Sequence, residues 1–384
     1  MDAPSAQLHQ ELRNAVTDAL STRRPLLHHL SADTAWLLQL PRPQQATRRG
    51  GRLYFNILID PWLSGTQTDV TSWLSTQWHA TRPRVPNIAA VEQLLREVEI
   101  LGASTRLSRA RKSNVQEMEE SGDLETYIDA VAISHEFTDH CHQKTLLEVH
   151  PDVPVFAAEK AVSLIDSWDH FRLVQRIPNF RDDPDWHATS MYPLPEWLGI
   201  SRLITNGDMG LFFHSAILIA FNSNMGMVPS RSGKARQVPE DESAEAVIYT
   251  PHGIHSDSDD LNFVATADPP IKTLALLHGL EYITLGAVPL NLGAHNGLRA
   301  QRILKAHYWI GTHDEHKSGT GIVGWLLRRR KISLKDAVRE ELNRRDGKRQ
   351  LSIGRPASPT TDVLGSFSGV NWTDLGNGES LVLE

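Results

Sequence analysis

Residues 129–142 constrain this chain more than any other stretch, because an apolar run within them ends in a cluster of possible metal ligands. The stretch reads Asp-Ala-Val-Ala-Ile-Ser-His-Glu-Phe-Thr-Asp-His-Cys-His. The run from Ala130 to Ile133 predicts a short buried strand, and a strand that delivers histidines and a carboxylate to its carboxyl end can present them to a metal ion. Imidazole and carboxylate suit zinc, manganese or iron, so ligand type alone does not choose among these metals.

The overall charge and the cysteine count narrow the class of protein. The formal net charge is −7 and the sequence pI is about 6.2, which argues against broad nucleic-acid binding because such proteins usually carry a basic surface. The single cysteine excludes an internal disulfide and fits a reducing compartment. No apolar run approaches the ~20 residues of a membrane span, and residues 1–46 show no secretory pattern. We therefore expect a cytoplasmic protein with no integral membrane segment and no nucleic-acid partner.

Four segments repeat one pattern, in which an apolar strand is followed by a histidine at or near its end. The histidines are His135, His214, His252 and His313. A lone histidine after a strand is usually a polar group that backbone partners satisfy, but four of them beside Asp139 and His140 indicate a shared site. The alternation of strands and helices along residues 127–168 indicates an α/β layering.

These motifs resemble those of the metallo-β-lactamase-fold superfamily, in the expected order from Leu53 to Gly324. The resemblance is carried by the strand end Ile57-Leu58-Ile59-Asp60, by residues 135–140, which match His-x-His-x-Asp-His except at one position, and by His214 and His313. The lactonase-like and phospholipase-D-like branch looks most similar, because Asp60 is followed by Pro-Trp-Leu-Ser-Gly. The resemblance implies an α/β fold, a four-layer αββα sandwich of two mixed β-sheets flanked by helices.

The resemblance and the composition divide the chain into three parts. Residues 47–345 would form the metallo-β-lactamase-like domain. Residues 1–46 are expected to form an N-terminal helical extension, because Leu8, Leu12, Val16 and Leu20 have helical spacing. Residues 346–384 are rich in Gly, Ser, Pro and Thr and are expected to form a C-terminal tail.

The chain departs from the family pattern at two points. Phe137 stands where the second histidine of the motif belongs, and phenylalanine cannot bind a metal. Pro251-His252-Gly253 stands where the family has a Gly-Asp pair whose carboxylate bridges two ions. His252 could serve as a terminal ligand, but an imidazole cannot bridge two ions as a carboxylate oxygen does.

The resemblance therefore implies two ligand sets of unequal completeness. His135, the missing histidine and His214 would form one set, which lacks a ligand. Asp139, His140 and His313 would form the other, which is complete. One bound ion is favoured over two, with zinc preferred and manganese or iron as alternatives. Whether Cys141, His142 or His255 replaces the missing ligand stays open, and so does a degenerate site that binds no metal.

The resemblance also implies roles for individual residues. Asp139 would bind the ion and orient the attacking water or accept its proton, and His140 and His313 would be neutral imidazole ligands. Asp60 would support the ligand loop by hydrogen bonds from outside the coordination shell. An alternative role for Asp139 is to cap a helix that begins near Cys141, since Asp is a favoured N-cap residue.

The function expected from these motifs is hydrolysis of an ester, lactone, thioester or phosphodiester in a small-molecule substrate, by a metal-activated water. Two alternatives stay open. One is a non-catalytic binding protein with a degenerate site, and the other is an iron-dependent oxidoreductase on the same fold. The sequence leaves the substrate and the oligomeric state undetermined.

Overall fold

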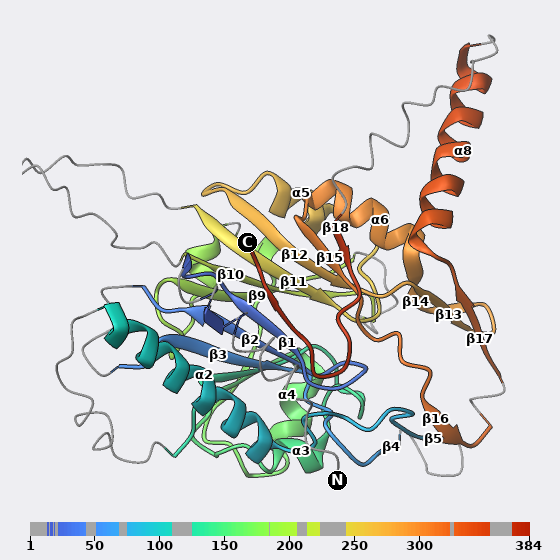
Figure 1. Ribbon diagram of the computed structural model, residues 1–384. Helices are drawn as coiled ribbons and strands as arrows, with labels where there is room; N and C mark the ends of the chain where they lie inside the picture. The colour runs from blue at the N-terminus through green and yellow to red at the C-terminus, as the bar shows by residue number, and fades with distance from the viewer. Residues whose placement is uncertain are drawn as a thin grey trace, which may run out of the picture.

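The computed structural model describes most of the chain. The described residues are 14, 16, 17, 19, 22–43, 51–68, 75–109, 125–183, 185–205, 213–222, 243–322, 326–353 and 371–384. The secondary structure alternates between strands and helices along most of this length, and it forms two large sheets and two small ones (Figure 1).

The first large sheet has seven strands and is mixed. Its order is β19-β1-β2-β3-β6-β7-β8. The strands are β1 (Leu26–His29), β2 (Trp36–Pro41), β3 (Tyr54–Ile59), β6 (Ala130–Ile133), β7 (Val155–Ala157), β8 (Val174–Arg176) and β19 (Ser380–Val382). Strands β3, β6, β7 and β8 run parallel, whereas β1, β2 and β19 join the sheet by antiparallel pairing.

The second large sheet has six strands in the order β18-β15-β12-β11-β10-β9. Its strands are β9 (Leu198–Leu203), β10 (Ala216–Phe221), β11 (Ala244–Thr250), β12 (Ile271–His278), β15 (Tyr308–Ile310) and β18 (Asn371–Thr373). Strands β9, β10 and β11 pair antiparallel, and β11, β12, β15 and β18 pair parallel. This sheet is therefore mixed as well.

The two sheets pack face to face over one core. Ile57 and Ile59 of β3 lie in the same apolar cluster as Ile217 and Ile219 of β10. Every residue of β3 is buried, as expected for a strand that is covered on both faces.

Helices cover the outer face of each sheet. They are α2 (Ile88–Arg109), α3 (Gln143–Leu146) and α4 (Glu159–Asp166) on the first sheet, and α5 (Asp259–Ala265) and α6 (Gly293–Leu304) on the second. Leu58 of β3 lies in one apolar cluster with Val91 and Leu95 of α2, and Leu218 of β10 lies in one cluster with Leu261 of α5. The fold is thus a four-layer αββα sandwich, which confirms the fold class predicted from the sequence (Figure 1).

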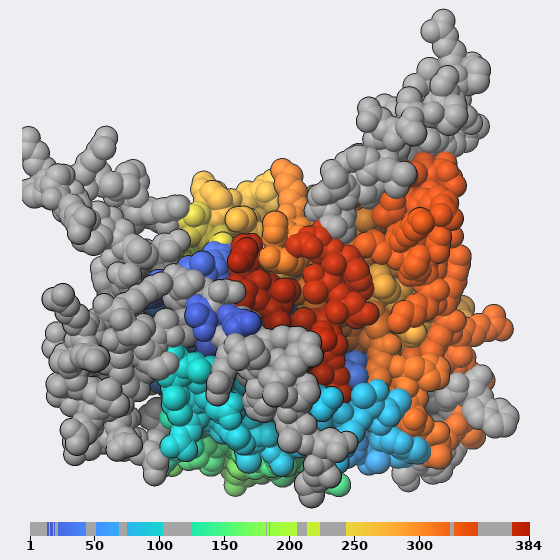
Figure 2. Space-filling model, in the orientation of Figure 1, coloured from blue at the N-terminus to red at the C-terminus, as the bar shows by residue number. Residues whose placement is uncertain are grey.

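Both ends of the chain contribute strands to the sandwich. Strands β1 and β2 lie within the segment expected to be a helical extension, although residues 14, 16, 17, 19 and 22 are helical. The difference arises because Leu26–His29 and Trp36–Pro41 are fully buried in the first sheet. Strands β18 and β19 come from the segment expected to be a tail, and Figure 2 shows these residues, in red, against both blue and orange parts of the surface.

Two small three-stranded sheets and a long helix flank the sandwich. One sheet has the order β16-β5-β4 and is formed by β4 (Thr66–Thr68), β5 (Thr76–Trp78) and β16 (Ser318–Thr320). The other has the order β14-β13-β17 and is formed by β13 (Glu281–Leu285), β14 (Val288–Leu292) and β17 (Leu327–Lys331). Helix α8 (Leu334–Ile353) starts after Ser333, whose hydroxyl accepts from Asp336 N at 3.1 Å and so caps the first turn. None of the helices in the described part of the chain is long and apolar enough to cross a membrane.

Candidate metal centre

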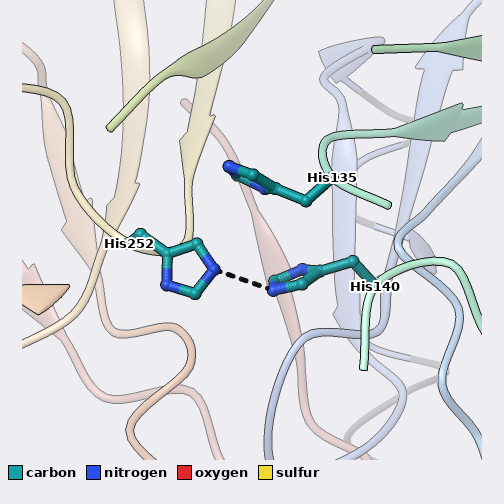
Figure 3. A group of neighbouring side chains, drawn as sticks. All are labelled: His135, His140 and His252. Carbon is teal, nitrogen blue, oxygen red and sulfur yellow. Dashed lines mark hydrogen bonds between the residues drawn. The ribbon is translucent and has the colours of Figure 1, made fainter. Parts of the chain in front are cut away.

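Four strand ends meet at one edge of the sandwich. Asp60 follows β3, residues 135–140 follow β6, His252 follows β11 and His313 follows β15. The first two segments belong to one sheet and the last two to the other. In Figure 3, His252 reaches towards His140 from the opposite side of the view, while His135 lies beside His140. Both sheets therefore supply side chains to one buried site.

His140 is fixed by a carboxylate on one ring nitrogen. Its Nδ1 lies 2.7 Å from Asp60 Oδ2, and Asp60 also accepts from the Ser134 backbone N–H at 2.7 Å. The second ring nitrogen, Nε2, lies 3.1 Å from His252 Nε2. A carboxylate on Nδ1 selects the tautomer and the ring orientation that a metal-binding histidine needs. His140 therefore has one ring nitrogen left for an ion.

His252 and His313 are held in the same way. His252 Nδ1 lies 3.0 Å from Asn291 Oδ1, and His313 Nδ1 lies 3.0 Å from Asp33 Oδ1. The ring centroids of His140, His252 and His313 are 4.9 to 5.1 Å apart in all three pairs. With each Nδ1 directed at an oxygen acceptor, each ring keeps Nε2 for a ligand.

The pKa values of these imidazoles differ because their neighbours differ. Burial lowers the pKa of His252 well below its ordinary value, and the nearby His135 lowers it further. Burial also lowers the pKa of His313, against the opposing effect of Asp33. Burial acts in the same direction on His140, but Asp139 and Asp60 outweigh it and raise its pKa. His252 and His313 are thus neutral near pH 7, and the two carboxylates make His140 the ring of the three that holds a proton most firmly.

Asp139 lies between two of the imidazoles and a lysine. Its Oδ1 lies 3.7 Å from His140 Nε2, and its Oδ2 lies 3.8 Å from His313 Nε2 and 2.6 Å from Lys317 Nζ. Burial opposes its negative charge, but Lys317 and His140 hold the pKa of Asp139 well below its ordinary value. Asp139 is therefore a carboxylate at neutral pH. It does not cap helix α3, whose N-cap is His142.

The side chains form two candidate ligand groups that share His140. One group is Asp139, His140 and His313, and the other is His135, His140 and His252; within each group the ligand atoms lie within 4.8 Å of one another. His135 is the least available member, because its Nε2 lies 2.9 Å from the Phe213 carbonyl oxygen and its Nδ1 lies 2.8 Å from Ser134 Oγ.

The structure does not bring His214 into either group. Its Nδ1 lies 3.2 Å from the Gly253 carbonyl oxygen and its Nε2 lies 3.3 Å from the Pro289 carbonyl oxygen. Phe137 takes the position of the missing histidine and packs on Phe213 with 5.0 Å between ring centroids. The first ligand set of the family pattern is therefore not assembled.

The three residues considered as replacements also lie outside both groups. Cys141 is buried in the core beneath α2, and burial raises the pKa of its thiol. His142 Nδ1 lies 2.9 Å from Thr145 Oγ1, and burial lowers the pKa of His142 to about 4. The His255 ring lies 4.7 Å from the His214 ring. Instead, His252 is the residue that approaches His135 and His140.

Sequence reasoning missed three residues of this site: Asp33, Asn291 and Lys317. Asp33 lies in the turn between β1 and β2, Asn291 lies in β14, and Lys317 directly precedes β16. Their contacts with Asp139, His252 and His313 join segments that are far apart along the chain, and no local motif marks them. The one local signal is the turn Ser31-Ala32-Asp33-Thr34 between two apolar runs.

Two residues of the site have unusual backbone conformations. Asp60 has φ 41° and His313 has φ 57°, and Asp60, His313, Arg23, Asp169 and Lys305 are the non-glycine residues with positive φ in the described part of the chain. Such conformations cost roughly 1–3 kcal/mol each and persist where the surrounding contacts impose them. Here the imposed turns direct Asp60 towards His140 and His313 towards Asp33.

A glycine shapes the turn that carries His252. Gly253 has φ 85°, and a Cβ atom at this position would lie 2.8 Å from His278 Nε2 and 3.0 Å from Leu292 Cβ. Only glycine combines this conformation with so close an approach. The Pro251-His252-Gly253 turn is thus packed tightly enough to fix the position of His252.

One further acidic group lies at the surface of the described structure. Glu125, His150 and Asp152 have ligand atoms within 4.8 Å of one another, but Glu125 and Asp152 are exposed. His150 Nε2 lies 3.2 Å from Glu125 Oε2. The group has no buried imidazole, and it provides a matched control for the buried site.

Comparisons with known proteins find similarity in structure alone. No protein-family model matches the sequence, and no curated protein matches it. Among solved structures, an isothiocyanate hydrolase from Delia radicum gut bacteria is 14% identical with a TM-score of 0.48, covering 94% of this chain and 99% of that one. A possible metal-dependent hydrolase from Veillonella parvula is 11% identical with a TM-score of 0.47, covering 94% and 100%. The metallo-beta-lactamase fold protein YhfI from Bacillus subtilis is 12% identical with a TM-score of 0.40, covering 93% and 99%. At such identities and TM-scores the similarity assigns no activity to this chain.

Proposed function

We propose that this protein is a metal-dependent hydrolase that binds one divalent ion through His140, His252, His313 and Asp139. The observation that carries the proposal is the ring of His140, which belongs to both ligand groups but has only Nε2 available, because Nδ1 is held by Asp60. A single lone pair serves one ion, so the two groups cannot both be filled. Three imidazoles and a carboxylate form a donor set that suits zinc, with manganese or iron as alternatives.

The donor set fits a metal ion on two physical grounds. Each of the three imidazoles is oriented through Nδ1 by an oxygen acceptor, namely Asp60, Asn291 or Asp33. Metal-binding histidines commonly have such partners. In addition, all four side chains are at least nine-tenths buried, and buried charged groups are usually paired or bound to a metal.

A bound divalent ion would lower the pKa of a water molecule and polarise a substrate carbonyl or phosphoryl oxygen. The protein would contribute the remaining functions. Asp139 keeps Oδ2 on Lys317, so Oδ1 is the oxygen that would bind the ion or accept the proton of the water. Phe137 and Phe213 form an apolar wall beside His252, which would exclude other water. We propose that the substrate is a small molecule that carries an ester, lactone, thioester or phosphodiester group.

A second function is favoured by one observation. Lys317 already neutralises Asp139 and also pairs with Asp33, so the cluster carries a compensating positive charge without any metal ion. A protein that kept the fold and bound a ligand without catalysis would show the same contacts.

Metal analysis of two matched variants separates these functions. The wild-type protein is expected to contain close to one zinc, manganese or iron ion per chain. His140→Ala should lose it, whereas His150→Ala, in the exposed acidic group, should keep it. A panel of ester, lactone, thioester and phosphodiester substrates then tests hydrolysis. Metal-free protein with full activity, or equal metal content in both variants, would refute the proposal.

A further inference from the structure

The side chain of Lys317 is buried in the candidate metal centre, where its ammonium group meets three acceptors. Nζ lies 2.6 Å from Asp139 Oδ2, 2.9 Å from Asp33 Oδ2 and 3.3 Å from Gln67 Oε1. The side chain is 6% exposed, and Nζ lies 5.0 Å from the centre of the Trp62 ring. A buried lysine in these surroundings stays protonated, because two carboxylates and an aromatic face stabilise its positive charge.

The contacts exclude several familiar roles for a buried lysine. An ammonium group has three N–H donors and no acceptor, and here three oxygen atoms surround it. A lysine that acts as a nucleophile or forms a Schiff base must instead be neutral, usually in an apolar pocket. Lys317 is therefore a fixed positive charge within the site rather than a reacting group.

The two carboxylates that bind Lys317 also face the imidazoles. Asp33 directs Oδ1 to His313 and Oδ2 to Lys317, and Asp139 directs Oδ1 towards His140 and Oδ2 towards Lys317. In each carboxylate, the oxygen that pairs with Lys317 defines a lysine side, although Asp139 Oδ2 also lies 3.8 Å from His313 Nε2. A metal ion binds a carboxylate oxygen at about 2.1 Å, so an ion on the lysine side would overlap with the ammonium group.

We propose that Lys317 is a built-in cation that occupies the carboxylate half of the donor cluster and limits the cluster to one metal ion. Removal of the ammonium group would leave Asp33 and Asp139 as an unoccupied pair of buried carboxylates, and this pair would take a second divalent cation that prefers oxygen ligands, such as Mn²⁺. The inference rests on the proposed function, which supplies the first ion. The binding site of the second ion, called the second position, depends only on Asp33, Asp139 and Lys317.

A cavity borders the segment that carries Lys317. It has a volume of about 480 Å³ and lies between β5, β16 and β17, where Lys317, Gln77 and Arg329 contribute to its wall. Lys317 thus belongs both to the wall of this cavity and, through Nζ, to the contacts of Asp139. A shorter or neutral side chain at this position would allow a hydrated ion to approach the two carboxylates.

The test compares Lys317→Met with Lys272→Met, which removes an exposed lysine of β12. Each full-length protein is stripped with a chelator and equilibrated with Mn²⁺, and bound metal and thermal unfolding are measured. Lys317→Met should bind one ion more per chain than wild type. Its metal-free form should unfold at a lower temperature, and Mn²⁺ should restore much of the loss. Lys272→Met should behave like wild type in both measurements.

Two further variants keep the test decisive if metal-free Lys317→Met does not fold. Lys317→Arg retains the charge and should bind the same amount of metal as wild type. The double variant Lys317→Met with Asp33→Asn removes one carboxylate along with the ammonium group, so it should fold and bind no additional ion. An unchanged metal content in Lys317→Met, or an additional ion in the double variant, would overturn the inference. If wild type binds no ion and Lys317→Met binds one, the inference about Lys317 stands and the proposed function fails.

Discussion

The Nε2 atoms of His140 and His252 lie 3.1 Å apart, although the two residues follow strands of different sheets. Two ring nitrogens approach this closely when one donates its N–H to the other, or when both bind one cation. The opposite pKa shifts of the pair agree with the first arrangement, because the pKa of His140 is raised and that of His252 is lowered. A metal ion at this position would replace that shared proton.

The first prediction concerns proton release. Because Asp139 and Asp60 raise the pKa of His140 against the effect of burial, the ring keeps its proton to a higher pH than an ordinary histidine, and it must lose that proton when Nε2 binds a metal. Apparent metal affinity should then rise with pH, by roughly tenfold per pH unit while His140 stays protonated. Competition with a chelator at several pH values measures the slope. An affinity independent of pH would show that His140 Nε2 is not a ligand.

The second prediction concerns Asp60. Asp60→Asn removes the charge that orients His140 and stabilises its Nδ1–H, while the side chain keeps an oxygen that can accept from Ser134 N. Metal affinity should fall by about 10–100-fold, measured by the same chelator competition. Asp152→Asn, in the exposed acidic group, is the matched control and should leave the affinity unchanged. Equal affinities in the two variants would remove Asp60 from the site.

The third prediction concerns the departure from the family motif at Phe137. Phe137→His restores the motif in sequence, yet the protein should still bind one ion per chain. The reason is that His214 contacts the carbonyl oxygens of Gly253 and Pro289, and His135 Nε2 contacts that of Phe213. Elemental analysis of the purified variant measures the metal content. Two ions per chain would mean that the turn carrying His214 adapts to a ligand.

The fourth prediction concerns the pH dependence of stability and a buried histidine of β1, His28, which belongs to neither ligand group. Burial lowers the pKa of His28 from 6.5 to about 4. Between these pH values the unfolded chain binds a proton that the folded chain does not, so stability falls as pH decreases from 6.5 towards 4. His28→Gln should reduce this slope by up to about 1.4 kcal/mol per pH unit. Urea unfolding at several pH values measures it, and an unchanged slope would contradict the assignment.

The sequence predicts the parts of the site that follow apolar strands. The runs at Tyr54–Ile59 and Ala130–Ile133 are buried on both faces, so each reads as a strand with polar residues at its carboxyl end. Because parallel strands end at the same edge, Asp60 could be expected close to residues 135–140. His252 and His313 follow the same logic in the second sheet.

The remaining residues could not be predicted, for reasons that depend on tertiary structure. Asp33 meets His313 across 280 positions and Lys317 meets Asp139 across 178 positions, and neither residue lies beside a motif. His214 follows the same local pattern as His252, yet the conformation of its turn directs the ring to backbone carbonyls. Strand patterns predict where a side chain leaves the sheet, but packing determines where it points.

The most direct test is a crystal structure of the metal-loaded protein with anomalous scattering measured at the absorption edge of the metal. We expect one anomalous peak per chain about 2.1 Å from His140 Nε2, with His252, His313 and Asp139 completing the coordination and Lys317 still on Asp139 Oδ2. A map with no peak at His140, or with a peak only at Glu125, His150 and Asp152, would contradict the account.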